Sequence, residues 1–259
     1  MINKKESNNN NNLSGIYEVI FENTLNPKDW VYNWFIIKNF FREFNFYLYD
    51  FNDNYPQYLN IVNNSSLKKF YGEFIYSGKS EDDYLSKELI NYFEKYNDVN
   101  NIRLKSINVK NIKIKESSIM RKSTALGSYN IQLNKPIHPT DWTYHWFIIK
   151  NMFAGLNYEI TELNDNYPEY RYIIGEKDIF TLNTFKNPKI RKENYLDVFE
   201  GICCVYNNKT NIGTKNLKKY EEFRDTEIHK VESFFEKYFK SNNISVKTID
   251  IAKDKISYY

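Results

Sequence analysis

The sequence predicts an α+β protein made of two tandem repeats. Residues 15–62 align without a gap on residues 127–174, and over 29–62 the two copies are identical at 18 of 34 positions. In each copy, apolar side chains alternate in short runs typical of strands and then recur at helical spacing. The length agrees, because 259 residues divide into two units of about 100 residues, each long enough to bury its own core.

The chain divides into a tail, two repeats and a linker. Residues 1–14 are polar and contain a run of Asn, so we expect a disordered tail there. Repeat 1 covers 15–114 and repeat 2 covers 127–259. The polar, serine-containing segment 115–126 is expected to link them.

Two shared motifs show that the second repeat is longer than the first. The copies start 112 positions apart, but the motif at 70–72 recurs 129 positions later and the motif Phe93–Tyr96 recurs 142 positions later. Repeat 2 therefore carries insertions near 175–198 and 207–220. Insertions fall in surface loops, where a duplicated protein often places a function of its own.

Each repeat opens with a strand and a helix. In repeat 1, Tyr17, Val19 and Phe21 alternate as in a half-buried strand. Asp29 is expected to cap a helix from Trp30 to about Phe44, and Asn45 suits the left-handed residue that closes it. The face expected to be buried carries Trp30, Trp34, Ile37, Phe41 and Phe44, matched in repeat 2 by Trp142, Trp146, Ile149, Phe153 and Leu156.

The rest of the unit adds strands and a second helix. Alternation predicts strands at 46–51, 58–62, 69–76 and 102–109, the last with a bulge near Ser106. Asn52–Pro56 has the composition of a turn. Ser80 and Asp83 are expected to cap the second helix. The simplest fold with this order is a ferredoxin-like antiparallel sheet with two helices on one face, and two such units commonly pair about a pseudo-twofold axis.

A second set of shared residues lies on the far side of the first helix. An exposed Phe between Tyr, Lys and Asn needs a reason to persist in both copies. One explanation is that the helices pack on each other and bury this stripe between the repeats. The other is a surface for a protein partner or a ligand, because exposed aromatic patches mark contacts. The candidate residues are Tyr32, Phe35, Lys38, Asn39, Tyr144, Phe147, Lys150 and Asn151.

A basic segment follows the second helix of repeat 1. Residues 101–122 carry seven Lys and Arg against one Glu, although the whole chain has a net charge of only +3. Such a segment can contact phosphate groups, whereas the alternative is a solvated edge strand and linker protected by lysines. The candidate nucleic-acid contacts are Arg103, Lys105, Lys110, Lys113 and Lys115.

Enzyme and membrane signatures are nearly absent. The eight Gly form no phosphate-binding loop, and none of the three His lies near Cys or paired carboxylates at metal-ligand spacing, so we predict no catalytic residue, metal or cofactor. The adjacent Cys203 and Cys204 suit a reducing, cytoplasmic environment. No apolar run is long enough to span a bilayer.

The leading hypothesis is therefore a non-enzymatic cytosolic binding or interaction protein with a protein partner. One alternative is an enzyme or small-molecule binder with its site in a cleft between the repeats, where polar side chains from both halves would have to converge. The other is a protein that binds RNA or single-stranded nucleic acid.

Overall fold

The computed structural model describes residues 13–50, 67–78, 82–111, 123–162, 185–187, 192, 195–206 and 217–253. The predicted turn at 52–56, the predicted strand at 58–62, residue Ser80, and nearly all of the tail lie outside these residues. So do most of the predicted linker and most of both insertions.

The first half of the chain forms one four-stranded sheet with two helices. Its elements are β1 (Leu13–Leu25), α1 (Pro27–Arg42), β2 (Phe46–Asp50), β3 (Leu67–Tyr76), α3 (Asp82–Val99) and β4 (Leu104–Asn111). The strand order is β2-β3-β1-β4, and every neighbouring pair is antiparallel. Tyr17 of β1 contacts both Trp34 of α1 and Phe93 of α3, so the two helices cover the same face.

The second half repeats this arrangement. Its elements are β5 (Ser123–Ile137), α4 (Pro139–Gly155), β6 (Tyr158–Glu162), β7 (Leu196–Tyr206), α6 (Leu217–Ser241) and β8 (Val246–Ala252). The order β6-β7-β5-β8 is again antiparallel throughout. Tyr129 contacts Trp146 and Phe235, as Tyr17 contacts Trp34 and Phe93. The predicted α+β class is confirmed, although β5 begins four residues before the start predicted for repeat 2.

Both first helices start three residues earlier than the sequence analysis predicted. The N-cap of α1 is Asn26, whose side chain accepts a hydrogen bond from the backbone N–H of Asp29 at 2.9 Å. Pro27 then occupies the first turn, where its fixed φ and missing N–H cost nothing. His138 caps α4 in the same way. The prediction that Asp29 is the cap is wrong, because Asp29 lies inside the first turn of α1, as its counterpart Asp141 does in α4.

Local backbone features recur in both halves. Asn45 and Asn157 follow the first helices with φ of 64° and 71°, which confirms the left-handed closure predicted for Asn45. In β4 the register against β1 skips Lys105, which confirms the bulge predicted near Ser106. In β8 the register against β5 skips Lys247 in the same way.

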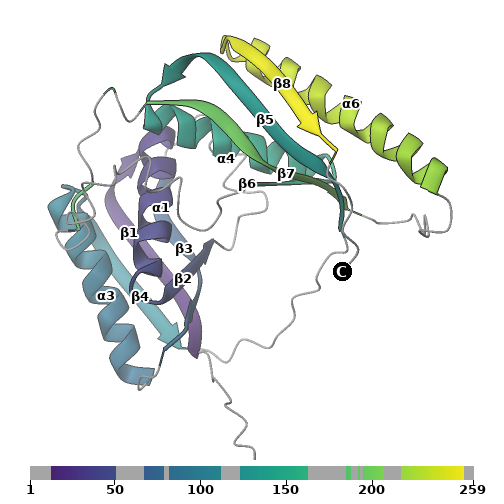
Figure 1. Cartoon of the computed structure of the whole chain (residues 1–259). Helices are drawn as coiled ribbons and strands as arrows, with labels where there is room; N and C mark the ends of the chain where they lie inside the picture. The colour runs from purple at the N-terminus through teal and green to yellow at the C-terminus, as the bar shows by residue number, and fades with distance from the viewer. Residues whose placement is uncertain are drawn as a thin grey trace, which may run out of the picture.

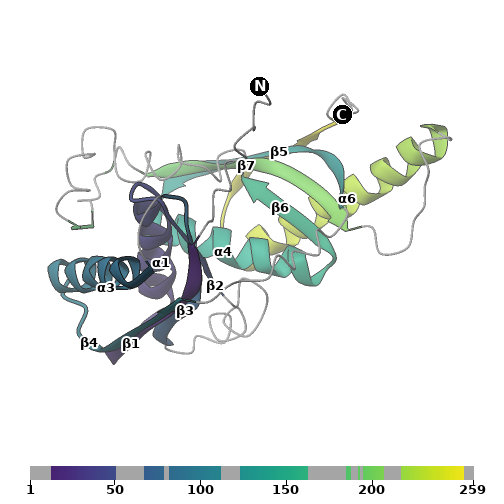
Figure 2. The same ribbon diagram turned by 90° about the horizontal axis from the view of Figure 1, so that it is seen from below.

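The two halves meet through their helices. α1 and α4 lie between the two sheets and contact each other, while the other faces of the sheets turn outward (Figures 1 and 2). The indole N–H of Trp30 donates to the carbonyl of Lys69 at 3.0 Å, and that of Trp142 donates to the carbonyl of Val198 at 2.8 Å. These buried indoles are therefore satisfied and anchor each helix to its own sheet.

Candidate functional site

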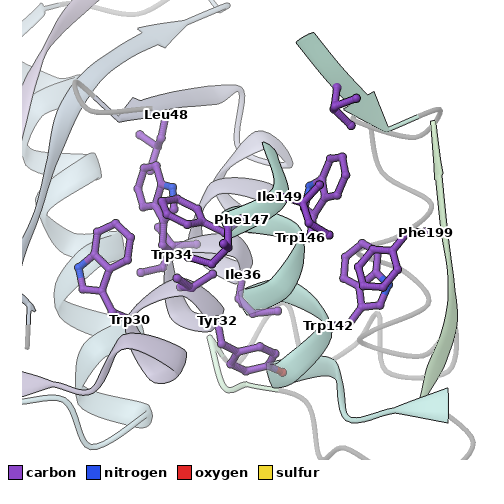
Figure 3. Packing of buried hydrophobic residues seen from close by; sticks show 14 of the residues in the cluster. Trp30, Tyr32, Trp34, Ile36, Leu48, Trp142, Trp146, Phe147, Ile149 and Phe199 are labelled. Atoms are coloured by element: carbon purple, nitrogen blue, oxygen red, sulfur yellow. The ribbon is translucent and has the colours of Figure 1, made fainter. Parts of the chain in front are cut away.

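The seam between α1 and α4 is aromatic. Phe147 of α4 packs edge-on against Trp30 of α1 with ring centroids 6.1 Å apart, and Phe35 of α1 packs edge-on against Trp142 of α4 at 6.5 Å. Figure 3 shows Phe147 pointing toward Trp30 and Trp34, from the opposite helix. Trp30 and Phe35 have the same places in repeat 1 as Trp142 and Phe147 in repeat 2, so the two contacts are reciprocal.

The shared stripe of candidate binding residues lies in or beside this seam. Tyr32, Asn39, Phe147 and Asn151 are buried, with exposed fractions from 5 to 9%. Phe35, Lys38, Tyr144 and Lys150 are half-buried. This placement corresponds to the first explanation above, packing between the repeats. The expectation of one buried helix face is corrected, because α1 is covered by its own sheet on one side and by α4 on the other.

Within the stripe, local hydrogen bonds satisfy the amide donors. The side chains of Asn39 and Asn151 donate to the carbonyls of Phe35 and Phe147 one turn earlier, both at 2.8 Å. The hydroxyl of Tyr32 has no hydrogen-bond partner among the described residues, and burial raises its pKa well above the ordinary value. At the edge of the seam Lys28 pairs with Asp141 and lies 5.9 Å from the ring centre of Tyr144.

A segment of the second half packs on the first half. Phe185 belongs to the insertion predicted near 175–198, but its ring lies against α1 and α3 and is 9% exposed. Its centroid is 4.8 Å from that of Phe40, 5.8 Å from that of Phe44 in a parallel stack, and 5.6 Å from that of Tyr92. Lys95 adds a cation 5.6 Å from the ring centre. We call Phe185–Asn187 the clamp.

Polar contacts fix the clamp at two points. Asn100, the residue after α3, holds the backbone of the clamp, since its amide donates to the carbonyl of Phe185 at 2.8 Å and its oxygen accepts from the N–H of Asn187 at 2.7 Å. The side chain of Asn187 donates to Asn33 of α1 at 2.9 Å. The hydroxyl of Tyr96 lies 2.7 Å from the amide oxygens of both Asn33 and Asn187.

The second half has the equivalent positions on and just after α4 and α6. Each position that contacts the clamp has a counterpart there: Phe40, Phe44 and Asn33 correspond to Met152, Leu156 and His145, and Tyr92, Tyr96 and Asn100 correspond to Phe234, Tyr238 and Asn242. We call these six counterparts the α4–α6 surface. Leu156 is 42% exposed, which makes it one of the few exposed large apolar side chains of the described chain. None of the described residues covers it as Phe185 covers Phe44.

His145 is the polar centre of the α4–α6 surface. Its Nδ1 lies 2.8 Å from the hydroxyl of Tyr238, which matches the contact between Asn33 and Tyr96. Burial lowers its pKa to about 4, an effect that the nearby Asp141 opposes and Lys28 reinforces. The ring is therefore neutral at pH 7, with one nitrogen a donor and the other an acceptor. Its Nε2 has no hydrogen-bond partner among the described residues.

Groups suited to catalysis are held in structural contacts. Cys203 faces the core, where burial raises the pKa of its thiol, so it does not ionise to the nucleophilic thiolate near neutral pH. Glu227 is buried and accepts hydrogen bonds from Tyr158 at 2.6 Å and Lys230 at 2.7 Å. No group of three His, Cys, Asp or Glu side chains within the described ranges is placed to hold a metal ion.

The remaining candidates lie on the outer surface. Arg103, Lys105 and Lys110 are exposed on or beside the edge strand β4, while Lys113 and Lys115 fall outside the described residues. A hollow of about 420 Å³ lies between α6 and β8, lined by Phe239, Ile244 and Val246 among others, and so does not lie between the halves. Across the described part of the chain, no helix combines the length and apolar character needed to cross a membrane.

Comparison with protein-family models, with curated proteins and with solved structures found no match. The residues that the sequence analysis missed are Phe185 and Asn187, together with the α4–α6 surface. An alignment of the two repeats cannot find the clamp, because the insertion has no counterpart in repeat 1. The sequence did contain one signal for the α4–α6 surface. Asn33 of repeat 1 is replaced by His145 in repeat 2, in a stretch of the first helix that otherwise changes little.

Proposed function

We propose that this chain is a non-enzymatic interaction protein that binds a segment of a partner protein on the α4–α6 surface. The observation that carries the proposal is the pair of equivalent surfaces. In the first half a segment of the chain itself covers the helix pair, while in the second half Leu156 stays 42% exposed. Two further apolar positions of this surface, Met152 and Phe234, are half-buried, and the cores of protein interfaces are enriched in Met and aromatic side chains.

The fold assignment that accompanies this proposal is a pair of ferredoxin-like units about a pseudo-twofold axis. The strand order β4-β1-β3-β2, with one helix after each inner strand, supports the first part. The reciprocal contacts of Trp30 with Phe147 and of Trp142 with Phe35 support the second, because a twofold interface pairs residue i with j and j with i. The free thiols Cys203 and Cys204 support a cytoplasmic location.

The other two functions remain as weaker proposals. A nucleic-acid ligand is supported by the exposed row of Arg103, Lys105 and Lys110, and its affinity would fall steeply with salt. A small-molecule site between the halves has less support, because aromatic rings of both helices meet in the seam and the amides of Asn39 and Asn151 donate within their own helices.

The test is selection of a random peptide-display library on the folded protein. We expect peptides that bind the wild type and are lost on Leu156→Asp, because a carboxylate at this position prevents an apolar side chain from docking. Tyr84→Asp is the matched control, since Tyr84 is 60% exposed and lies on α3 of the other half. Both substitutions are at exposed positions, so both proteins should fold. Selection of no peptide that distinguishes Leu156→Asp from Tyr84→Asp would overturn the proposal.

A further inference from the structure

We infer that the α4–α6 surface binds a segment in which an aromatic residue is followed two positions later by an asparagine, in the way the clamp binds α1 and α3. This inference rests on the proposed function and specifies the chemistry of its ligand. The contacts of Phe185 and Asn187 with the first half are the template for the contacts that the second half can make with a ligand.

The apolar part of the template is preserved. Phe40, Phe44 and Tyr92 form the seat of the Phe185 ring, and Met152, Leu156 and Phe234 take their places. Met and Leu are smaller in area than Phe but flexible, so they can close around a ring that Phe side chains would hold more rigidly. Lys237, the exposed counterpart of Lys95, can supply the same cation over the face of the ring.

The two-residue spacing between the aromatic residue and the asparagine of the ligand is set by Asn100, which bonds to the backbone of the clamp. Asn100 binds the carbonyl of Phe185 and the N–H of Asn187 at the same time, so the ring and the second polar side chain leave the clamp two residues apart. Asn242 is the counterpart of Asn100. Its amide makes the same bond to the carbonyl four residues earlier, to Tyr238 at 2.8 Å, as Asn100 makes to Tyr96 at 2.7 Å. Its position and orientation on the helix are therefore kept, and its side chain is exposed.

The polar part of the template selects an amide. Asn187 donates to Asn33 and lies within hydrogen-bond distance of the Tyr96 hydroxyl. In the second half Tyr238 occupies Nδ1 of His145, which leaves Nε2 for the ligand. An asparagine can form a hydrogen bond with Nε2 in either tautomer of the ring, because its amide offers both a donor and an acceptor. A carboxylate could form one only with the tautomer that carries the proton on Nε2.

The clamp itself provides the probe. A fluorescein-labelled peptide with residues 181–189 contains the Phe-Lys-Asn sequence and is titrated with the full-length protein by anisotropy. Because the tethered clamp occupies α1 and α3 at a high effective concentration, the free peptide should bind wild type at one site only. We expect Leu156→Asp to weaken binding by at least about ten-fold, the loss typical of a central contact, and Tyr84→Asp to leave it unchanged.

Changes in the peptide and in the clamp sharpen the test. Replacing the Phe or the Asn of the peptide by Ala should each weaken binding by about ten-fold while the protein stays the same. Phe185→Ala in the protein removes the ring of the clamp and leaves the α4–α6 surface unchanged, so binding of the peptide to that surface should stay the same. Equal binding of the Asn and Ala peptides would overturn the inference.

The outcomes separate this inference from the function on which it rests. If the probe fails to bind wild type while the library yields other peptides sensitive to Leu156→Asp, the ligand chemistry is wrong and the binding function stands. If the library also yields none, the proposed function is wrong as well.

Discussion

The first and second helix pairs of this protein differ in one respect that matters for function. Both pack an aromatic core, both close the first helix with a left-handed asparagine, and both have an asparagine after the second helix, but only the first pair is covered by the clamp. The covering segment comes from the second half, within the insertion predicted near 175–198. It covers a surface of the first half, while none of the described residues covers the equivalent surface of the second half in this way.

The largest difference between the halves should appear when the clamp is removed. Phe185→Ala should lower the free energy of unfolding by about 3 kcal/mol, the usual cost of deleting a buried Phe ring. Leu156→Ala should cost less than about 1 kcal/mol, because this side chain is already 42% exposed. Urea denaturation followed by far-UV circular dichroism checks both values. Lys186→Ala is the control, since Lys186 is exposed within the same segment.

Equal losses for Phe185→Ala and Leu156→Ala would contradict the comparison. They would mean either that the clamp contributes no stability or that Leu156 is buried in solution.

The polar centres of the two surfaces should differ in their response to acid. His145 has a pKa of about 4 in the folded chain, below the ordinary value of 6.5, so the folded state binds fewer protons than the unfolded state between these two pH values. Above pH 6.5 the ring is neutral in both states and the free energy of unfolding is at its full value. As the pH falls toward 4, the ring gains a proton in the unfolded state first, and the free energy of unfolding decreases. At about 1.4 kcal/mol per pH unit, this amounts to a loss of roughly 2 to 3 kcal/mol.

His145→Asn gives the second half the residue that the first half has and isolates this effect. Unfolding free energies measured from pH 7 to 4 should fall less steeply in the variant, by about the amount given above. His229→Asn is the matched control, because that ring is 80% exposed. Parallel pH profiles for wild type and His145→Asn would show that the ring is not held neutral by burial.

A smaller effect is expected at the polar end of the clamp. Asn187→Ala removes the hydrogen bond to Asn33 and leaves a buried amide oxygen with one partner fewer. We expect a loss of about 1 to 2 kcal/mol in the free energy of unfolding. Asn242→Ala, at an exposed position without a clamp, should cost less than about 0.5 kcal/mol. If both variants lost the same stability, the hydrogen bonds of Asn187 would not matter to the clamp.

Sequence patterns predicted the parts of this fold that local physics decides. Alternation and helical spacing located the strands near 46–51, 69–76 and 102–109 and the Trp-bearing face of α1, and Asn45 was correctly placed as the left-handed closing residue. The stripe of Tyr32 and Phe147 was harder, because burial by a second helix depends on how the halves pack. The contact of Phe185 with Phe40, across 145 positions, leaves no local signal at all.

The smallest expected effect concerns a charged contact at the edge of the seam. Lys28 pairs with Asp141, but the reciprocal pair does not exist, because Thr140 stands where repeat 2 would need a lysine opposite Asp29. Both side chains of the pair are more than one third exposed, so Lys28→Ala should lower the free energy of unfolding by no more than about 0.5 kcal/mol. Salt should abolish even this difference, since solvent ions screen exposed charges. Denaturation in 0.1 M and about 1 M NaCl checks it, and a loss above 2 kcal/mol that persists in high salt would show that the ion pair, and not the reciprocal rings, holds the halves together.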